Sequence, residues 1–232
     1  MHLILLHLKH IKMMKLSSNY NLMIAIIGCA FLNSCDTKTP EHLSPKDQLI
    51  LTKNKTIENM QSAYKGEVTA TAKYEAFAIK AESEGYHEIA TLYKAVSCAE
   101  SIHAQNHLIV IEDAGAAIPI VKPQFTVKTT KENLEDDING EAYEATTMYP
   151  DFLKMAKEAN NQIAFLSLSY AMKTEEKHKH FFEQALGDLN SNMLISLPSK
   201  YYVCPDCGNT YSNAPNHCDF SLTKKENFLV FE

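Results

Sequence analysis

Glu100-Ser-Ile-His103 and Glu175-Glu-Lys-His178 are two copies of the pattern Glu-x-x-His, and they decide how this chain is expected to fold. Residues three apart lie on one face of a helix, so each copy directs a carboxylate and an imidazole toward the same point. Both copies fall on stripes that are otherwise apolar at helical spacing, which predicts that they are buried. A buried carboxylate is costly unless a positive group compensates it.

Two other predicted helices each place one carboxylate on an apolar stripe, Glu67 within residues 60–81 and Glu141 within residues 134–155. Glu144 adds a further carboxylate one turn after Glu141. Few basic groups share these faces, which indicates a shared multivalent cation. Bundles that hold two irons or manganese ions combine one Glu from each of two helices with a Glu-x-x-His from each of the other two. The sequence therefore predicts an all-α bundle around two metal ions.

Two other candidate groups are interpreted differently. Glu84-Gly-Tyr-His87 also matches Glu-x-x-His, but Gly85 is typical of a helix C-terminus, and His87 would then begin the next helix. His107 lies one turn past His103 and is expected to be a hydrogen-bonded core histidine instead of a ligand. Position on an apolar stripe, and not the motif alone, makes the other two copies credible.

The chain has 232 residues, enough for one main core and a small module. Its net charge of -6 gives no reason to expect nucleic-acid binding. The expected organisation is a signal peptide at 1–35, a polar tether at 36–52, a four-helix bundle at 53–187, a linker at 188–199 and a cysteine-containing module at 200–232.

The helical pattern breaks near Gly85, across residues 115–130 and near Asn160. The break at 115–130 is long enough to cross a bundle from end to end, as the long connection of a ferritin-like four-helix bundle does. Pro150 falls inside the third helix and is expected to kink it just past the paired glutamates.

The first 35 residues have the pattern of a bacterial export signal. Two lysines precede a short apolar run, residues 22–32, and the segment ends in Leu-Asn-Ser-Cys35. A cysteine directly after a small residue resembles a lipoprotein signal. Cys35 is therefore expected to carry a lipid that anchors an exported protein to a cell-envelope membrane, on its periplasmic or surface side. Cys29 is a second candidate site, and an uncleaved membrane anchor is the alternative interpretation.

Beyond residue 200 the composition changes, and Cys204-Pro-Asp-Cys207-Gly208 forms a knuckle typical of iron or zinc sites. A second knuckle would complete four sulfurs, but it reads Cys218-Asp-Phe-Ser221. Three interpretations remain for this tail. It is a three-cysteine metal site with Ser221 or water as the fourth ligand, a metal-free fold, or a disulfide such as one between the first two cysteines.

Taken in order, these motifs resemble the rubrerythrin family: a Glu-bearing helix, Glu-x-x-His, Gly140-Glu-x-x-Glu144, a second Glu-x-x-His and a Cys-x-x-Cys-Gly tail. Local sequence agrees in Tyr74-Glu-Ala-Phe77 and in Met148-Tyr149-Pro150. The resemblance covers roughly residues 53–232. It implies a ferritin-like bundle, two non-haem irons, a rubredoxin-like tail that holds an iron or a zinc, and a homodimer.

The resemblance also implies a ligand set for the two irons: Glu67, Glu100, His103, Glu141, Glu144, Glu175 and His178. Within this set Glu100 and Glu175 would bridge the irons, and one iron would move between His103 and Glu144 as the site changes oxidation state.

The implied activity is reduction of hydrogen peroxide to water with electrons from an unidentified donor. Tyr74 and Tyr149 match tyrosines that hydrogen-bond ligand carboxylates, and the alternative is that they are plain core aromatics. Two departures matter. Ser221 breaks the four-cysteine set through which relatives pass electrons, and an exported protein is unusual in a mostly cytoplasmic family. Other interpretations are an iron-binding ferroxidase without true peroxidase turnover, or a metal-free or zinc-loaded structural bundle.

Overall fold

The structure is a computed structural model that describes residues 44–191, 193 and 196–232. The predicted signal peptide, with its lipidation site at Cys35 or Cys29, lies outside the described residues. In chain order the helices are α1 (Pro45–Ser83), α2 (His87–Asp113), α3 (Thr130–Tyr143), the π-helical turn η1 (Glu144–Met148), α4 (Tyr149–Glu158) and α5 (Gln162–Asn190). The tail contains β1 (Tyr201–Val203), β2 (Thr210–Tyr211), the 3-10 turn η3 (Lys225–Asn227) and β3 (Leu229–Phe231).

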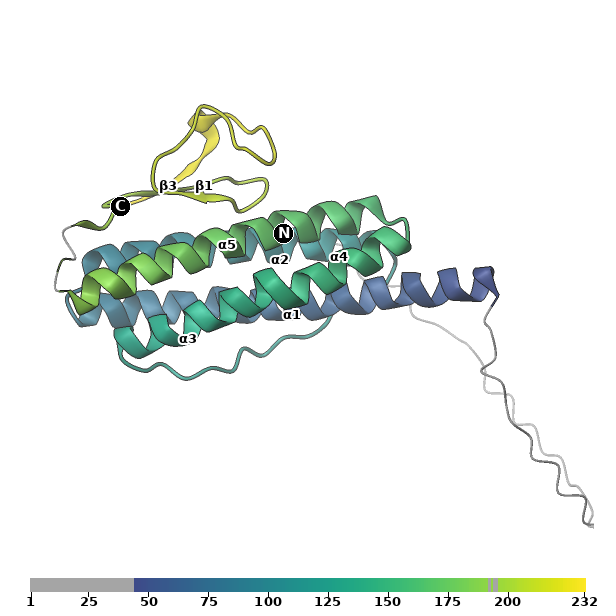
Figure 1. Ribbon diagram of the computed structural model, residues 1–232, viewed down its shortest axis with the longest axis horizontal. Coiled ribbons are helices and arrows are strands. Elements are labelled where there is room, and N and C mark those ends of the chain that lie inside the picture. Colours follow the sequence, from purple (N-terminus) through teal and green to yellow (C-terminus); the bar gives the residue numbers. More distant parts are fainter. Residues whose placement is uncertain (1–43, 192, 194–195) are drawn as a thin grey trace, which may run out of the picture. The chain divides into compact units, whose positions relative to one another are not determined.

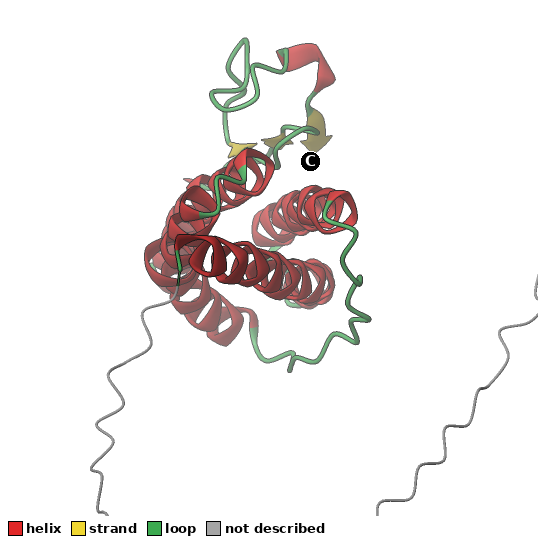
Figure 2. Cartoon of the chain, turned by 90° about the vertical axis from the view of Figure 1, so that its right-hand side faces the viewer, coloured by secondary structure: helices red, strands yellow, loops and turns green. Residues whose placement is uncertain are grey.

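The helices form four long segments that pack along one another and confirm the predicted four-helix bundle (Figures 1 and 2). α1 packs along α2, while α3, η1 and α4 follow one another as the third segment and pack against α5. Contacts of α2 with α5 and of α1 with α4 close the bundle. None of the helices in the described part of the chain is both long and apolar enough to cross a membrane.

α1 begins earlier than predicted, because residues 45–52 are helical and do not belong to a tether spanning 36–52. Ser44 caps the helix by accepting a hydrogen bond from the backbone N–H of Asp47 at 3.2 Å. Pro45 occupies the first helical turn, where its missing N–H costs no intrahelical bond. The proline that suggested a tether therefore marks a helix start. At the other end, α5 continues past the expected boundary at residue 187.

The turn between α1 and α2 has the form predicted for Glu84-Gly-Tyr-His87, a helix end followed by the start of the next helix. Gly85 has φ of +85°, a left-handed conformation that favours glycine, and α2 starts at His87. The His87 side chain is exposed and lies 2.7 Å from a carboxylate oxygen of Glu82. It points away from the bundle core.

The long crossover lies between the end of α2 and the start of α3 and runs along the outside of the bundle (Figure 1). The Gln61 side chain donates a hydrogen bond to the carbonyl of Ala117 at 2.7 Å near the start of the crossover. At its end, Thr129 and Glu132 form a reciprocal capping box that begins α3. The connection between α2 and α3 thus crosses the bundle from end to end, as predicted for residues 115–130 (Figure 1).

The third segment is interrupted close to the predicted place, but the interruption begins at the second of the paired glutamates, Glu144, and not just past it. The interruption takes the form of the π-helical turn η1, and Pro150 lies in the first turn of α4 that follows. Proline cannot donate a backbone hydrogen bond, so the regular pattern cannot pass through this position. Single π-helical turns occur often at functional sites.

The buried core of the bundle consists of two apolar clusters with a polar layer between them, and a third cluster lies in the tail. One cluster contains Tyr74, Tyr93 and Phe182, and the other contains Met60 and Leu168. On α1, α2 and α5 the buried carboxylates and imidazoles fall in sequence between the residues of the two clusters. The apolar residues above and below therefore enclose the polar layer.

The tail folds as a three-stranded antiparallel sheet in the order β2-β1-β3. Tyr202 of β1 pairs with Tyr211 of β2 on one side and with Val230 of β3 on the other. β1 contacts α2, and Tyr201 and Val203 pack into the same apolar cluster as α1 and α2. This packing holds the cysteine knuckle against the bundle.

Candidate metal centre

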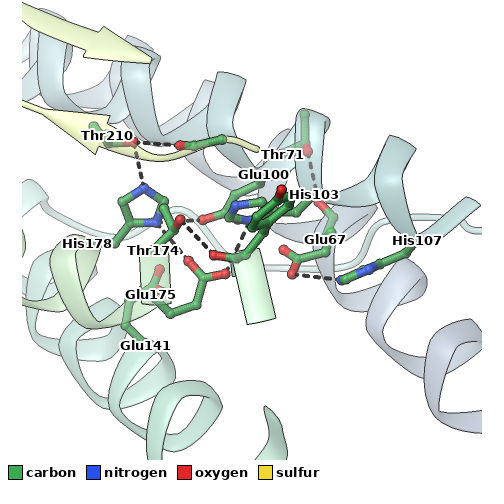
Figure 3. A network of polar contacts seen from close by, with 12 residues as sticks. Glu67, Thr71, Glu100, His103, His107, Glu141, Thr174, Glu175, His178 and Thr210 are labelled. Carbon is green, nitrogen blue, oxygen red and sulfur yellow. Dashed lines mark hydrogen bonds and ion pairs between the residues drawn. The ribbon is translucent and has the colours of Figure 1, made fainter. Parts of the chain in front are cut away.

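Four helical segments contribute to the polar layer, with Glu67 from α1, Glu100 and His103 from α2, Glu141 from α3, and Glu175 and His178 from α5 (Figure 3). All six side chains are at least 98% buried. The structure thus brings together, from distant parts of the sequence, six of the seven ligands that the resemblance implied.

Their donor atoms form two groups, and each group could hold one metal ion. The first consists of Glu67, Glu100, His103 and Glu175. His103 Nδ1 lies 2.9 Å from Glu100 Oε2 and 3.2 Å from Glu175 Oε1. Three carboxylates and one imidazole form a donor set that suits iron or manganese.

The second group consists of Glu100, Glu141, Glu175 and His178. His178 Nδ1 lies 3.0 Å from Glu100 Oε1 and 2.9 Å from Glu175 Oε2. Glu100 and Glu175 therefore belong to both groups, each with one oxygen near His103 and the other near His178. This is the position expected of carboxylates that bridge two metal ions.

Several buried atoms in this layer have no hydrogen-bond partner, which is rare in protein interiors. They are Glu141 Oε2, both carboxylate oxygens of Glu175, His178 Nδ1 and His103 Nε2, and the last of these faces the tail instead of the carboxylates. His178 Nδ1 lies close to two carboxylates, yet the geometry makes no hydrogen bond with either. Donor atoms that converge without bonding to one another are arranged as metal ligands are.

The electrostatics of the layer also fit a cation. Burial raises the pKa of Glu67 well above its usual value, and the charges of Glu100 and Glu175 raise it further. Burial, followed by the charge of Glu100, likewise raises the pKa of Glu175 and of Glu141. Without a cation, both effects favour the protonated form of these carboxylates. Divalent cations would compensate both the burial and the mutual repulsion.

Two buried tyrosines form hydrogen bonds to the carboxylates of Glu67 and Glu141. The Tyr74 hydroxyl donates a hydrogen bond to Glu141 Oε1, and the Tyr149 hydroxyl donates one to Glu67 Oε1. In each case one oxygen of the glutamate is occupied by the tyrosine. The tyrosines that the resemblance matched are therefore in contact with the candidate ligands and are not only core aromatics.

His107 is a hydrogen-bonded core histidine, as predicted. Its Nδ1 lies 2.7 Å from Ser167 Oγ, and its Nε2 lies 3.2 Å from the Tyr149 hydroxyl. Burial, with the nearby His103, lowers the pKa of His107 to about 3, so the ring is neutral. Sequence analysis did not foresee that His107 and Ser167 extend the contact between Tyr149 and Glu67.

Glu144 differs from the other predicted ligands because it belongs to neither group of donor atoms. It is the first residue of η1 and its side chain is half-buried. Burial and the charge of Glu100 raise its pKa to about 7. The structure thus places Glu144 beside the site but leaves its role as a ligand a prediction.

The tail brings three thiols together. Cys204, Cys207 and Cys218 are buried and free, with their donor atoms in one group, which argues against the disulfide interpretation. The Ser221 hydroxyl lies 3.2 Å from Cys204 Sγ, so a serine oxygen stands where a fourth sulfur is expected. Hydrogen bonding from Cys207 lowers the pKa of Cys204 to about 5, which favours the thiolate that binds metals.

Comparison with known proteins agrees with this geometry. The rubrerythrin family model matches residues 58–186, which is more than half of the chain. The chain belongs to the rubrerythrin family. It is 33% identical over 178 residues to rubrerythrin-2 of Clostridium acetobutylicum, covering 76% of this chain and 96% of the relative. It is 31% identical over 179 residues to nigerythrin of Nitratidesulfovibrio vulgaris, covering 76% of this chain and 86% of the relative.

Solved structures of nigerythrin are also similar to this chain. The fully reduced, all-ferrous form superposes with a TM-score of 0.68 at 31% identity, covering 76% of this chain and 86% of the nigerythrin chain. The fold is therefore a ferritin-like bundle with a rubredoxin-like tail. The chain is a di-iron protein of a family of oxidoreductases that act on peroxides, and its cysteine cluster provides a site for an iron or a zinc.

Replacing Ser221 by cysteine should convert the tail into a four-thiolate site. The serine oxygen already lies 3.2 Å from Cys204 Sγ, one of the three grouped thiols, so the iron-loaded S221C variant should show the absorption spectrum of a four-thiolate iron. The iron-loaded native protein should show a different spectrum, and Ser221→Ala tests whether the hydroxyl is itself a ligand. A four-thiolate spectrum from the native protein would mean that another group supplies the fourth sulfur.

Proposed function

We propose that this member of the rubrerythrin family is a non-haem di-iron peroxidase that reduces hydrogen peroxide to water with electrons from a separate donor. In this proposal Glu100 and Glu175 would be ligands held in common by the two irons, since each belongs to both groups of donor atoms. That sharing is the observation that carries the proposal. The full proposed ligand set is Glu67, Glu100, His103, Glu141, Glu144, Glu175 and His178.

When bound, two ferrous ions supply the two electrons that one peroxide molecule needs. The surrounding residues orient the ligands and exclude water. Tyr74 and Tyr149 hold Glu141 and Glu67 in place, while the apolar clusters on either side keep bulk water away. Glu144 has a pKa of about 7, so it can hold or release a proton near neutral pH. Reduction of one peroxide to two waters consumes two protons, and Glu144 would be able to provide one only while it is not bound to iron.

Electrons for repeated turnover enter, in this proposal, through the cysteine cluster of the tail. The knuckle that follows Cys204 packs directly on the bundle, where the Asn106 side chain donates a hydrogen bond to the carbonyl of Asp206 at 3.0 Å. A metal held by three thiolates and the Ser221 oxygen would have a different reduction potential from a four-thiolate site, because oxygen is a harder donor than sulfur. A tail that holds zinc instead would require electrons to arrive by another route.

The proposal places the protein at the bacterial cell envelope, anchored by a lipid on Cys35 and assembled as a homodimer. The support for export and lipidation is the pattern of the first 35 residues. At that location it would protect against peroxide that arises outside the cytoplasm.

The test is to reduce the iron-loaded protein without oxygen and to follow its oxidation by stopped flow. We expect hydrogen peroxide to oxidise the centre faster than dioxygen, and an added electron donor to sustain peroxide consumption over many turnovers. Equal or faster oxidation by dioxygen would contradict a peroxidase. Turnover that requires fresh ferrous iron, and that no electron donor can sustain, would assign the protein as a ferroxidase.

A further inference from the structure

The tail makes direct contact with both candidate histidine ligands on the side that faces away from the carboxylates. Gly208 and Thr210 are the tail residues involved, and they lie one and three positions after Cys207. Thr210 Oγ1 lies 3.0 Å from His178 Nε2 (Figure 3). A Cβ added to Gly208 would lie 2.4 Å from His103 Nε2, so the glycine backbone already packs against that ring.

The bonds of Thr210 determine which nitrogen of His178 carries the proton. The Thr210 hydroxyl donates its one hydrogen to the carbonyl of Gly208 at 3.1 Å. It can therefore only accept a hydrogen bond from His178, which requires the proton to be on Nε2. The lone pair of the neutral ring is then on Nδ1, the atom that lies 3.0 Å from Glu100 and 2.9 Å from Glu175. This is the tautomer that binds a metal at the carboxylate side.

The same tail segment is tied to the cysteine cluster. The backbone N–H of Gly208 donates to the carbonyl of Cys204 at 2.9 Å, and the N–H of Cys204 donates to the carbonyl of Asn209 at 3.0 Å. The Lys177 side chain donates to Asn209 Oδ1 at 2.7 Å. Consecutive residues of α5, Lys177 and His178, thus contact consecutive residues of the knuckle.

We propose that Thr210 is a positioning residue for the di-iron centre: it holds His178 in the tautomer and orientation that bind metal, so the folded tail strengthens metal binding in the bundle. Hydrogen-bond partners of this kind typically change metal affinity by roughly 10- to 100-fold. The proposal rests on the di-iron site but not on peroxide turnover. A failed peroxidase test would therefore not contradict the proposed role of Thr210.

The test is a cobalt(II) titration of the full chain carrying Thr210→Val, compared with the native protein. Cobalt bound to thiolates gives charge-transfer bands that report the tail, and cobalt bound to carboxylate and imidazole gives weaker visible bands that report the bundle. We expect the valine variant to bind cobalt in the bundle roughly 10- to 100-fold more weakly, with the tail bands unchanged. Valine suits a strand position such as Thr210, so the tail should still fold.

Two controls isolate the hydroxyl. Thr210→Ser keeps the hydroxyl and loses the methyl, and it should restore native affinity in the bundle. Thr69→Val removes a hydroxyl that bonds only to the backbone of α1, and it should have no effect. Native affinity in the Thr210→Val variant would overturn the proposal, as would equal weakening in the serine and valine variants. If the valine change unfolded the tail, the Thr210→Ser variant would provide the test. Weaker cobalt binding in the bundle of that variant, with the tail bands intact, would contradict the proposal.

Discussion

Glu100→Ala should abolish binding of both irons in the bundle, whereas Glu141→Ala should weaken mainly one. Glu100 contributes to both groups of donor atoms, with Oε2 near His103 and Oε1 near His178, while Glu141 contributes to one group. Loss of an outer hydrogen-bond partner already lowers metal affinity by roughly 10- to 100-fold, so loss of a shared ligand should exceed that. Elemental analysis after anaerobic reconstitution should give close to no iron in the bundle of the Glu100 variant.

The matched control is Glu176→Ala, which removes a carboxylate next to Glu175 on the exposed side of α5. It should leave iron content and peroxide reduction unchanged. Circular dichroism should show the same helix content in both variants. A Glu100→Ala protein that still held close to two irons in the bundle would show that the two groups of carboxylates do not share a bridging ligand.

The centre of the bundle was predictable because its signals are local. Each Glu-x-x-His motif occupies one turn of one helix, and its position on an apolar stripe follows from spacing along that helix. Gly85 is a local signal of the same kind. A left-handed glycine ends the helix between Glu84 and His87, so these two residues were not predicted to be metal ligands. The grouping of donor atoms, with Glu100 and Glu175 shared, needed the packing of four helices and could only be inferred from the resemblance.

Features that depend on contacts between distant segments were not predictable. The hydrogen bond between Thr210 and His178 joins a strand of the tail to α5, and nothing in the spacing of either residue indicates it. Ser167 lies one position away from the apolar stripe of α5, so the sequence pattern gave little indication of its hydrogen bond to His107. The start of α1 was missed for a different reason. Proline both favours extended tethers and begins helices, and only the cap formed by Ser44 distinguishes the two.

In the metal-free protein, Glu67→Gln should be stabilising at pH 8, and this gain should shrink as the pH falls. Burial and neighbouring carboxylates raise the folded-state pKa of Glu67 above its unfolded value. Stability from its protonated form is therefore fully present below about pH 4.5 and is lost as the pH rises through the folded-state pKa, at up to about 1.4 kcal/mol per pH unit. Glutamine is neutral at every pH and avoids this loss. Each kcal/mol corresponds to roughly 2–4 °C in melting temperature for a chain of this size.

Bound metal should reverse the stability difference between the native protein and the Glu67→Gln variant. Iron binding requires deprotonated carboxylates and imidazoles, so the stabilisation that metal provides grows as the pH rises through the range in which the metal-free protein loses stability. Comparing native protein with the glutamine variant cancels the contributions of the cysteines and other histidines, which titrate in both. Melting temperatures should be measured between pH 5 and 8, with and without ferrous iron. Without metal the glutamine variant should have the higher melting temperature, and with metal the native protein should. A native protein that remained the more stable of the two at pH 8 without metal would show that the carboxylate layer does not need a cation.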